Sequence, residues 1–165
     1  MFGLFEKKIN PDEQAQALCR DLVPQWAKVV DLVAAVDGVC ARQYEAGLFV
    51  CIVALLTLEE QRRSKLDAVR SAFVAYWLVT LSDNPNEPDG PKDQQLTEVL
   101  FERYPYYRAI EDDIDTSPVR WVLELVSNCA EEDRSDKLAE CMRVVPALGE
   151  VMAQVRAHAE AAAKG

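Results

Sequence analysis

A chain of 165 residues with 50% hydrophobic and 28% charged residues is long enough to form one hydrophobic core and too apolar for a disordered protein. We therefore expect a single domain over residues 1–165. The formal net charge is −10, and residues 83–165 hold 18 of the acidic residues but only nine of the basic ones. A negative surface repels phosphate backbones, so this balance predicts a basic partner and no nucleic-acid binding.

Cysteine usage and the first residues bear on the compartment. The five cysteines are odd in number and contain no Cys-x-x-Cys pair, which is typical of reduced thiols in a reducing compartment. The opening MFGLFEKKIN lacks the apolar segment and small-residue cleavage site of a secretory signal. We therefore expect a cytoplasmic protein.

The first predicted helix begins after Asn10, where Pro11 and two acidic residues follow a potential N-cap. Apolar residues at helical spacing continue this pattern to the Asp37-Gly38 turn, and Pro24 predicts a kink or a restart within it.

The next segment, AGLFVCIVALLTL over residues 46–58, contains no charge. As a helix it is about 20 Å long, whereas a bilayer core is about 30 Å thick, so we expect a buried helix and no membrane span. A core strand is the alternative, because Val50, Ile52 and Val53 are β-branched.

The segment TLEE resembles a capping box, with Thr57 as the N-cap of a new helix and Glu60 at its third position. The helix predicted after it carries one apolar stripe that we expect to face the core, formed by Leu66, Val69, Phe73, Trp77 and Leu81. Residues 82–92 contain three prolines and a glycine, so they predict a flexible loop between two helical halves.

Four helical patterns follow that loop. They cover residues 93–104, ending before Pro105, then 106–115, then 117–130, and a last helix from Ser135 that bends at Pro146. The tail, residues 159–165, has few apolar residues to bury, and we expect it to fray. The fold class predicted from these patterns is all-α, a compact helical bundle of six to seven helices.

Most catalytic motifs are missing from the sequence. The six glycines do not cluster into a phosphate-binding loop, and the one histidine, His158, lies in the tail. The acidic pairs Glu59-Glu60 and Glu131-Glu132 lack the third carboxylate of an E-E-x-x-E metal motif, because Arg63 and Ser135 stand at that position. We therefore expect no cofactor and no bound metal, and we favour a function other than catalysis.

One short stretch is similar to a known family. DLVAAVDGV, residues 31–39, is similar to the helix and turn that open tellurite-resistance TerB-like helical domains. The acidic residues of the family's next turn are replaced here by Cys40, Ala41 and Arg42. The similarity covers nine residues, and we base no assignment on it.

The remaining candidate site combines tyrosines with acids. Guanidinium groups stack on aromatic rings and pair with carboxylates, so such a cluster favours a basic protein or an Arg-rich peptide as the partner. The expected partner-binding residues are Tyr104, Tyr106, Tyr107, Glu111, Asp112, Asp113, Asp115, Glu131, Glu132 and Asp133. The opposing interpretation is that the tyrosines pack at a helix corner made by Pro105 while the acids solvate a loop.

Three functions are therefore compared. The first is a cytoplasmic protein-interaction module, such as an adaptor, a secretion chaperone or an immunity-type inhibitor, whose acidic second half binds a basic partner. The second is a metal-dependent enzyme or regulator that assembles a carboxylate cluster between helices from Glu59, Glu60, Asp112, Asp113 and Asp115. The third is a homo-oligomeric structural bundle, and a homodimer is compatible with the first function as well.

Overall fold

The computed structural model describes residues 10–36, 42–61, 63–108 and 117–164. Regular structure in these ranges is entirely helical, which confirms the all-α prediction. The described helices are α1 (Pro11–Ala34), α2 (Gln43–Glu60), α3 (Leu66–Ser82), α4 (Asp93–Arg108), α5 (Ser117–Ser127), the 3₁₀ turn η2 (Glu131–Asp133), α6 (Arg134–Met142) and α7 (Val145–Lys164).

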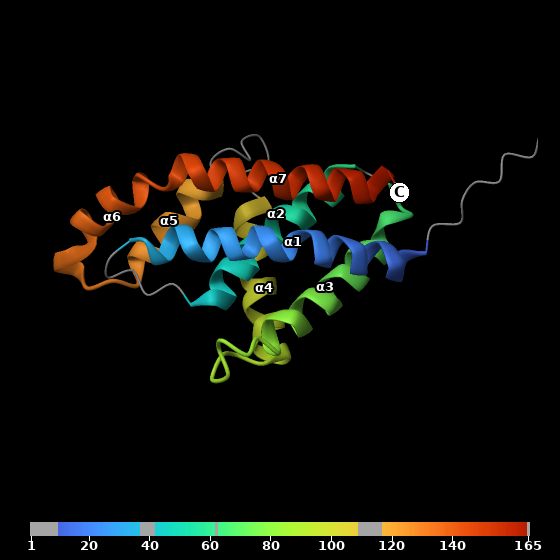
Figure 1. Cartoon of the computed structure of the whole chain (residues 1–165), viewed down its shortest axis with the longest axis horizontal. Helices are drawn as coiled ribbons and strands as arrows, with labels where there is room; N and C mark the ends of the chain where they lie inside the picture. The colour runs from blue at the N-terminus through green and yellow to red at the C-terminus, as the bar shows by residue number, and fades with distance from the viewer. Residues whose placement is uncertain (1–9, 37–41, 62, 109–116, 165) are drawn as a thin grey trace, which may run out of the picture.

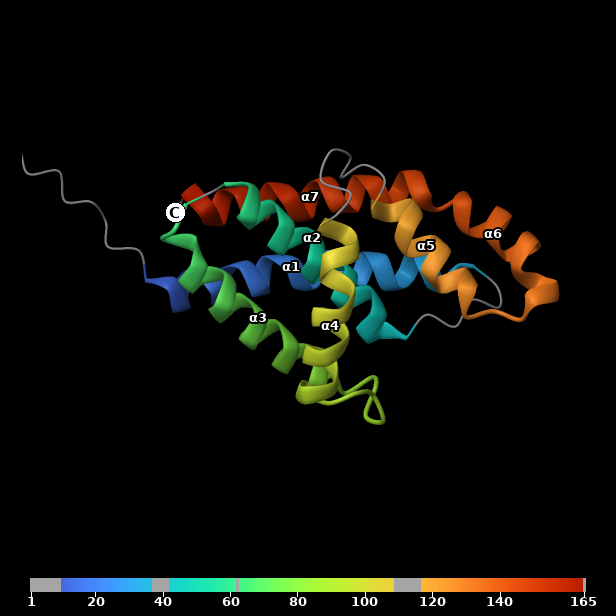
Figure 2. The same ribbon diagram turned by 180° about the vertical axis from the view of Figure 1, so that it is seen from behind.

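Helix α2 runs through the middle of an elongated bundle. It packs against α1, α3, α4 and α7, while α1 also packs against α3 and α7 (Figure 1). Seen from behind, α4 crosses in front of α2 on the opposite side of the bundle from α1, and α5 and α6 occupy one end (Figure 2). None of the described helices combines the length and the apolar character that a membrane span requires.

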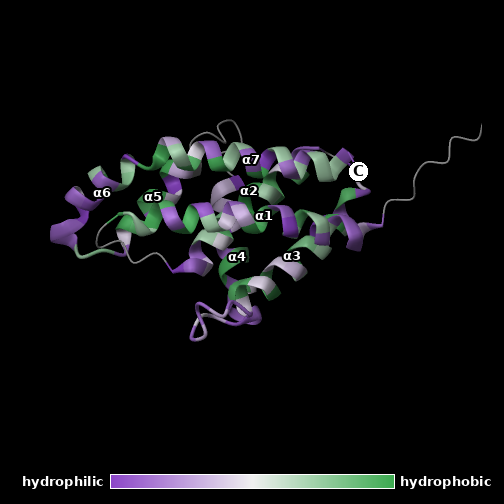
Figure 3. Ribbon diagram, viewed as in Figure 1, coloured by the Kyte–Doolittle hydropathy of each residue, from purple (hydrophilic) through white to green (hydrophobic). Residues whose placement is uncertain are grey.

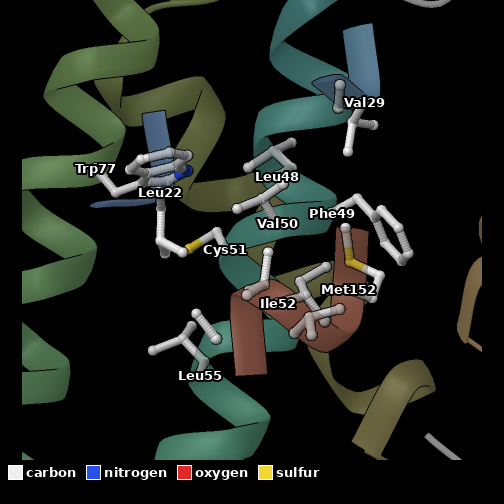
Figure 4. Packing of buried hydrophobic residues seen from close by; sticks show 14 of the residues in the cluster. Leu22, Val29, Leu48, Phe49, Val50, Cys51, Ile52, Leu55, Trp77 and Met152 are labelled. Atoms are coloured by element: carbon white, nitrogen blue, oxygen red, sulfur yellow. The ribbon is translucent and has the colours of Figure 1, made fainter. Parts of the chain in front are cut away.

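Helix α2 has no solvent-facing side over most of its length. Every residue from Ala46 to Leu58 is buried, so the charge-free run is the central core helix that the sequence predicts, and the strand alternative is wrong. A helix that is apolar all round must be covered on all sides, and neighbouring helices cover it here. Figure 4 shows Cys51 beside Leu22, and Ile52 beside Met152 of α7.

The predicted stripe of α3 is confirmed, since all five of its residues are buried. Trp77 from this stripe donates its indole N–H to the carbonyl oxygen of Gly47 at 2.8 Å, and Leu81 occupies the space that a side chain at Gly47 would need. Trp26 of α1 packs edge-on against Trp77, with ring centroids 5.9 Å apart. The glycine therefore permits the close approach of α2 and α3.

Several predicted helix boundaries are wrong. Thr57 is not an N-cap: it lies inside α2, and its hydroxyl donates to the carbonyl oxygen of Val53 at 2.8 Å. Pro24 lies within an uninterrupted α1, and Pro105 lies within α4, which continues to Arg108. Helix α1 therefore does not restart at Pro24, and α4 does not end before Pro105.

The loop between α3 and α4 is anchored to the core, which differs from the flexible connection predicted from its composition. Glu87 is only 8% exposed, and its carboxylate accepts the backbone N–H groups of Gln43 and Tyr44 at 2.9 and 3.0 Å. It also pairs with Arg42 at 2.8 Å. These bonds satisfy N–H groups at the start of α2, because the side chain of its own N-cap residue, Arg42, does not cap the helix.

The end of the chain also differs from its prediction. The last helix is divided into α6 and α7, and Pro146 stands at the start of α7 and not at a bend within one helix. Helix α7 continues to Lys164, and Ala159 and Ala163 of the expected frayed tail are buried. His158 lies on this ordered helix, with its Nδ1 3.8 Å from a carboxylate oxygen of Asp21 on α1.

The cysteines of the described ranges are free thiols. Cys19, Cys51 and Cys141 are buried, and Cys129 is partly buried. Burial raises the pKa of Cys19 to about 12 and raises that of Cys51 as well, because a thiolate is poorly solvated in the core. These two thiols are therefore protonated at neutral pH.

Candidate interaction surface on helix α4

Helix α4 carries two different faces, and they divide the predicted tyrosines. Leu96, Leu100 and Tyr107 point into the core. The outer face is formed by Glu98, Phe101, Glu102, Pro105 and Tyr106, all exposed. At about 100° per residue these positions lie on one half of the helix circumference, so they form a continuous strip along the helix. We call these five residues the outer face of α4.

Tyr107 belongs to the core, so its prediction as a partner-binding residue is wrong. It is 3% exposed, and its hydroxyl donates to Oε2 of Glu124 on α5 at 2.9 Å. Its ring lies 6.2 Å from that of Phe49, which stacks on Trp121. Burial, followed by the nearby Glu124 carboxylate, raises the pKa of Tyr107, so the phenol stays protonated and donates.

Tyr104 is also directed inward. Its hydroxyl donates to Oε2 of Glu59 at 2.5 Å, and Arg108 contacts Oε1 of the same carboxylate at 2.8 Å. Arg70 of α3 lies 4.0 Å from Oε2. Burial and the bond to Glu59 raise the pKa of Tyr104. Glu59 therefore joins α2, α3 and α4, and its charge is compensated within the protein.

A second ion pair fixes α4 against the start of α2. Arg103 contacts both carboxylate oxygens of Glu45, with its second nitrogen 3.0 Å from Oε1. This paired arrangement raises the pKa of the Arg103 guanidinium. The two-point contact restricts how α4 can rotate, and it therefore defines which residues form the outer face.

Tyr106 is the one predicted tyrosine that faces solvent, and it is 58% exposed. The guanidinium carbon of Arg120 lies 5.7 Å from its ring centroid and 5.8 Å from that of Tyr107. This distance is within the range of a cation–π contact. The structure therefore already contains an arginine beside the Tyr106 ring.

An open groove of about 300 Å³ lies between α4 and the end of α5. We call it the α4–α5 groove. Its lining includes Glu102, Arg103, Tyr106, Glu124, Ser127 and Asn128. Tyr106 and Glu102 connect it to the outer face of α4.

Phe101 is the main residue of this surface that sequence reasoning did not identify. It is 72% exposed, the highest exposure among the large apolar side chains described. The sequence contained a signal for this exposure. Leu96, Leu100 and Tyr104 are spaced four apart and form the inward stripe of α4, whereas Phe101 lies next to Leu100 and outside this stripe. Aromatic residues are enriched at protein–protein interfaces, so an exposed ring marks this face as a candidate contact surface.

The predicted acids are only partly located. Glu111, Asp112, Asp113 and Asp115 lie outside the described residues. Glu131, Glu132 and Asp133 form η2 and are exposed. Glu131 follows the groove residue Asn128 by three positions, so the chain holds it within about 11 Å of the groove. Figure 3 shows the adjoining α6 as strongly hydrophilic.

The carboxylate cluster of the metal-dependent alternative is only partly described. Glu59 and Glu60 end α2, whereas its three aspartates lie outside the described ranges. Among described residues there is no group of three or more His, Cys, Asp or Glu side chains placed to hold a metal ion. Glu59 accepts bonds from Tyr104 and Arg108, which gives it a structural role.

Comparison with known proteins gives no assignment: the chain matches no protein-family model, no curated protein and no solved structure.

Proposed function

We propose that the protein is an interaction module that binds a basic protein segment on the outer face of α4 and the adjoining α4–α5 groove. The observation that carries this proposal is the composition of that face. Two exposed aromatic rings, Phe101 and Tyr106, flank the exposed carboxylates of Glu98 and Glu102. Aromatic rings contribute apolar contact area and cation–π attraction, and carboxylates contribute charge.

The internal bonds of α4 support this role. Arg103 and Glu45, and Tyr107 and Glu124, hold the inner face of the helix in a fixed position. A rigid surface loses less conformational entropy on binding than a mobile one, so the same contacts give a higher affinity. The outer face of α4 is therefore a prepared surface and not a flexible acidic segment.

The charge distribution supports a basic partner. The net charge of −10 attracts cations over the Debye length, which is about 8 Å at physiological ionic strength. Such attraction accelerates encounter with a basic partner and disfavours nucleic acids. The proposal covers three roles in which such a surface would bind a basic partner: an adaptor, a secretion chaperone and an immunity-type inhibitor.

A charge-reversal experiment tests the proposal. Surface plasmon resonance measures the binding of oligo-arginine and oligo-lysine peptides to the protein at low and high salt. We expect salt-sensitive binding that Glu98→Lys with Glu102→Lys abolishes. The matched control, Glu13→Lys with Asp31→Lys on α1, produces the same change in net charge, from −10 to −6, and should retain most of the binding.

The control separates a local surface from the general attraction of an acidic protein. If both double variants lose binding equally, the whole-protein charge is responsible, and the assignment to α4 is wrong. If neither peptide binds at low salt, the proposed function itself is wrong. Circular dichroism should show unchanged helicity in both variants, because all four residues are exposed.

A further inference from the structure

We infer that the α4–α5 groove is a pocket for a single arginine side chain of the partner, and that it selects arginine over lysine. This inference rests on the proposed function and specifies it further. The groove combines the three groups that recognise a guanidinium: the exposed ring of Tyr106, the carboxylate of Glu102 and the carboxylate of Glu124. Its volume of about 300 Å³ accommodates one long side chain and leaves no space for a folded element.

The walls of the groove are fixed before a ligand arrives. Oε2 of Glu124 accepts the hydroxyl of Tyr107 at 2.9 Å, and the hydroxyl of Ser127 donates to the backbone oxygen of Glu124 at 2.6 Å. Arg103 is held by both oxygens of Glu45, which compensates its positive charge at the edge of the groove. The other charged residues that line the groove are Glu102 and Glu124, and the guanidinium of Arg120 lies beside Tyr106.

The protein's own Arg120 shows that the Tyr106 ring accepts a guanidinium. Its guanidinium carbon lies 5.7 Å from the ring centroid of Tyr106. An aromatic ring has two faces, and cations are attracted to both because each carries the same negative quadrupole. A ligand arginine therefore stacks on Tyr106 from the groove side or replaces Arg120 on the ring.

Arginine and lysine differ in how they use such a pocket. The guanidinium is planar, stacks on a ring and forms two parallel bonds to a carboxylate, whereas the lysine ammonium is a strongly hydrated point charge. Both side chains benefit equally from the net charge of the protein. A preference for arginine therefore reports the groove itself and not the long-range attraction.

The test compares oligo-arginine and oligo-lysine peptides of equal length by fluorescence anisotropy. The wild-type protein should bind the arginine peptide about fivefold more tightly, the ratio that corresponds to roughly 1 kcal/mol of cation–π stabilisation. Tyr106→Phe keeps the ring and should keep this preference, whereas Tyr106→Leu removes it. Glu102→Gln should weaken the arginine peptide more than the lysine peptide, and Glu98→Gln, outside the groove, should weaken both equally.

Two results would overturn the inference while leaving the proposed function in place. One is equal affinity of the wild-type protein for both peptides, and the other is an arginine preference that survives Tyr106→Leu. If neither peptide binds, the proposed function and the inference are both wrong. Melting temperatures of the variants confirm that each is folded, and Glu102→Gln, an exposed polar exchange, provides a variant whose folding is not at risk.

Discussion

Replacing Glu87 by alanine removes the cap of the central helix, and its cost follows from the bonds in the structure. The carboxylate accepts the backbone N–H groups of Gln43 and Tyr44, which lie 44 and 43 residues away along the chain. Loss of one capping bond costs about 1 kcal/mol, and loss of a negative charge at a helix N-terminus costs about 0.3–1 kcal/mol. With two N–H groups left in a partly buried position, we expect Glu87→Ala to lower the free energy of unfolding by about 2–3 kcal/mol.

Urea denaturation followed by circular dichroism at 222 nm measures this difference directly. For a domain of this size the same loss should lower the melting temperature by about 5–10 °C. Glu87→Gln keeps one acceptor oxygen and should lie between wild type and Glu87→Ala. The matched control is Asp89→Ala in the same loop, where the carboxylate is 77% exposed and pairs with Arg42 at 3.2 Å. It should change stability by less than about 0.5 kcal/mol. If Glu87→Ala is no more destabilising than Asp89→Ala, the loop does not cap α2.

Three further predictions concern the core, the thiols and the undescribed acids. Ile52→Asp places an unpaired charge in the middle of α2 and should destabilise the fold by about 4 kcal/mol or more, measured by urea denaturation; a near-native midpoint would contradict the burial of this position. Cys19 and Cys51 should resist alkylation in the native protein at pH 8 and react once it is unfolded, as mapped by mass spectrometry, because burial raises both pKa values; rapid native labelling would contradict this. Asp112→Lys with Asp113→Lys should slow association with the oligo-arginine peptide in surface plasmon resonance and leave the melting temperature within about 2 °C of wild type. An unchanged association rate would show that these two acids do not belong to the binding surface.

The sequence alone was sufficient for the fold class and for the central core. A charge-free run of thirteen residues flanked by charges is too short to span a membrane as a helix and must be covered on every side, and α2 is buried in this way. That the run is a helix and not a core strand was decided by the structure. The five-residue stripe of α3 was predictable for the same reason, since apolar residues at helical spacing must face a common apolar neighbour. These are local patterns, and burial follows from them directly.

The composition of the candidate surface was predictable only in part. Tyr104, Tyr106 and Tyr107 are close in sequence, but consecutive residues of a helix are separated by about 100° around its axis. Once Pro105 lies inside α4, the three rings point to α2, to solvent and to α5 respectively. The sequence identified the residue types of the surface, and the direction of each ring depended on the helix continuing through the proline.

Contacts between distant segments were decided by the tertiary structure alone. Thr57 matches a capping box in sequence, yet α2 continues past it because its neighbours bury this turn and its hydroxyl bonds to the preceding turn. The N–H groups at the start of α2 are instead satisfied by Glu87, from a loop whose composition predicts only flexibility. A cap needs only an acceptor at the right point in space, so no local pattern identifies one that is supplied from more than forty residues away.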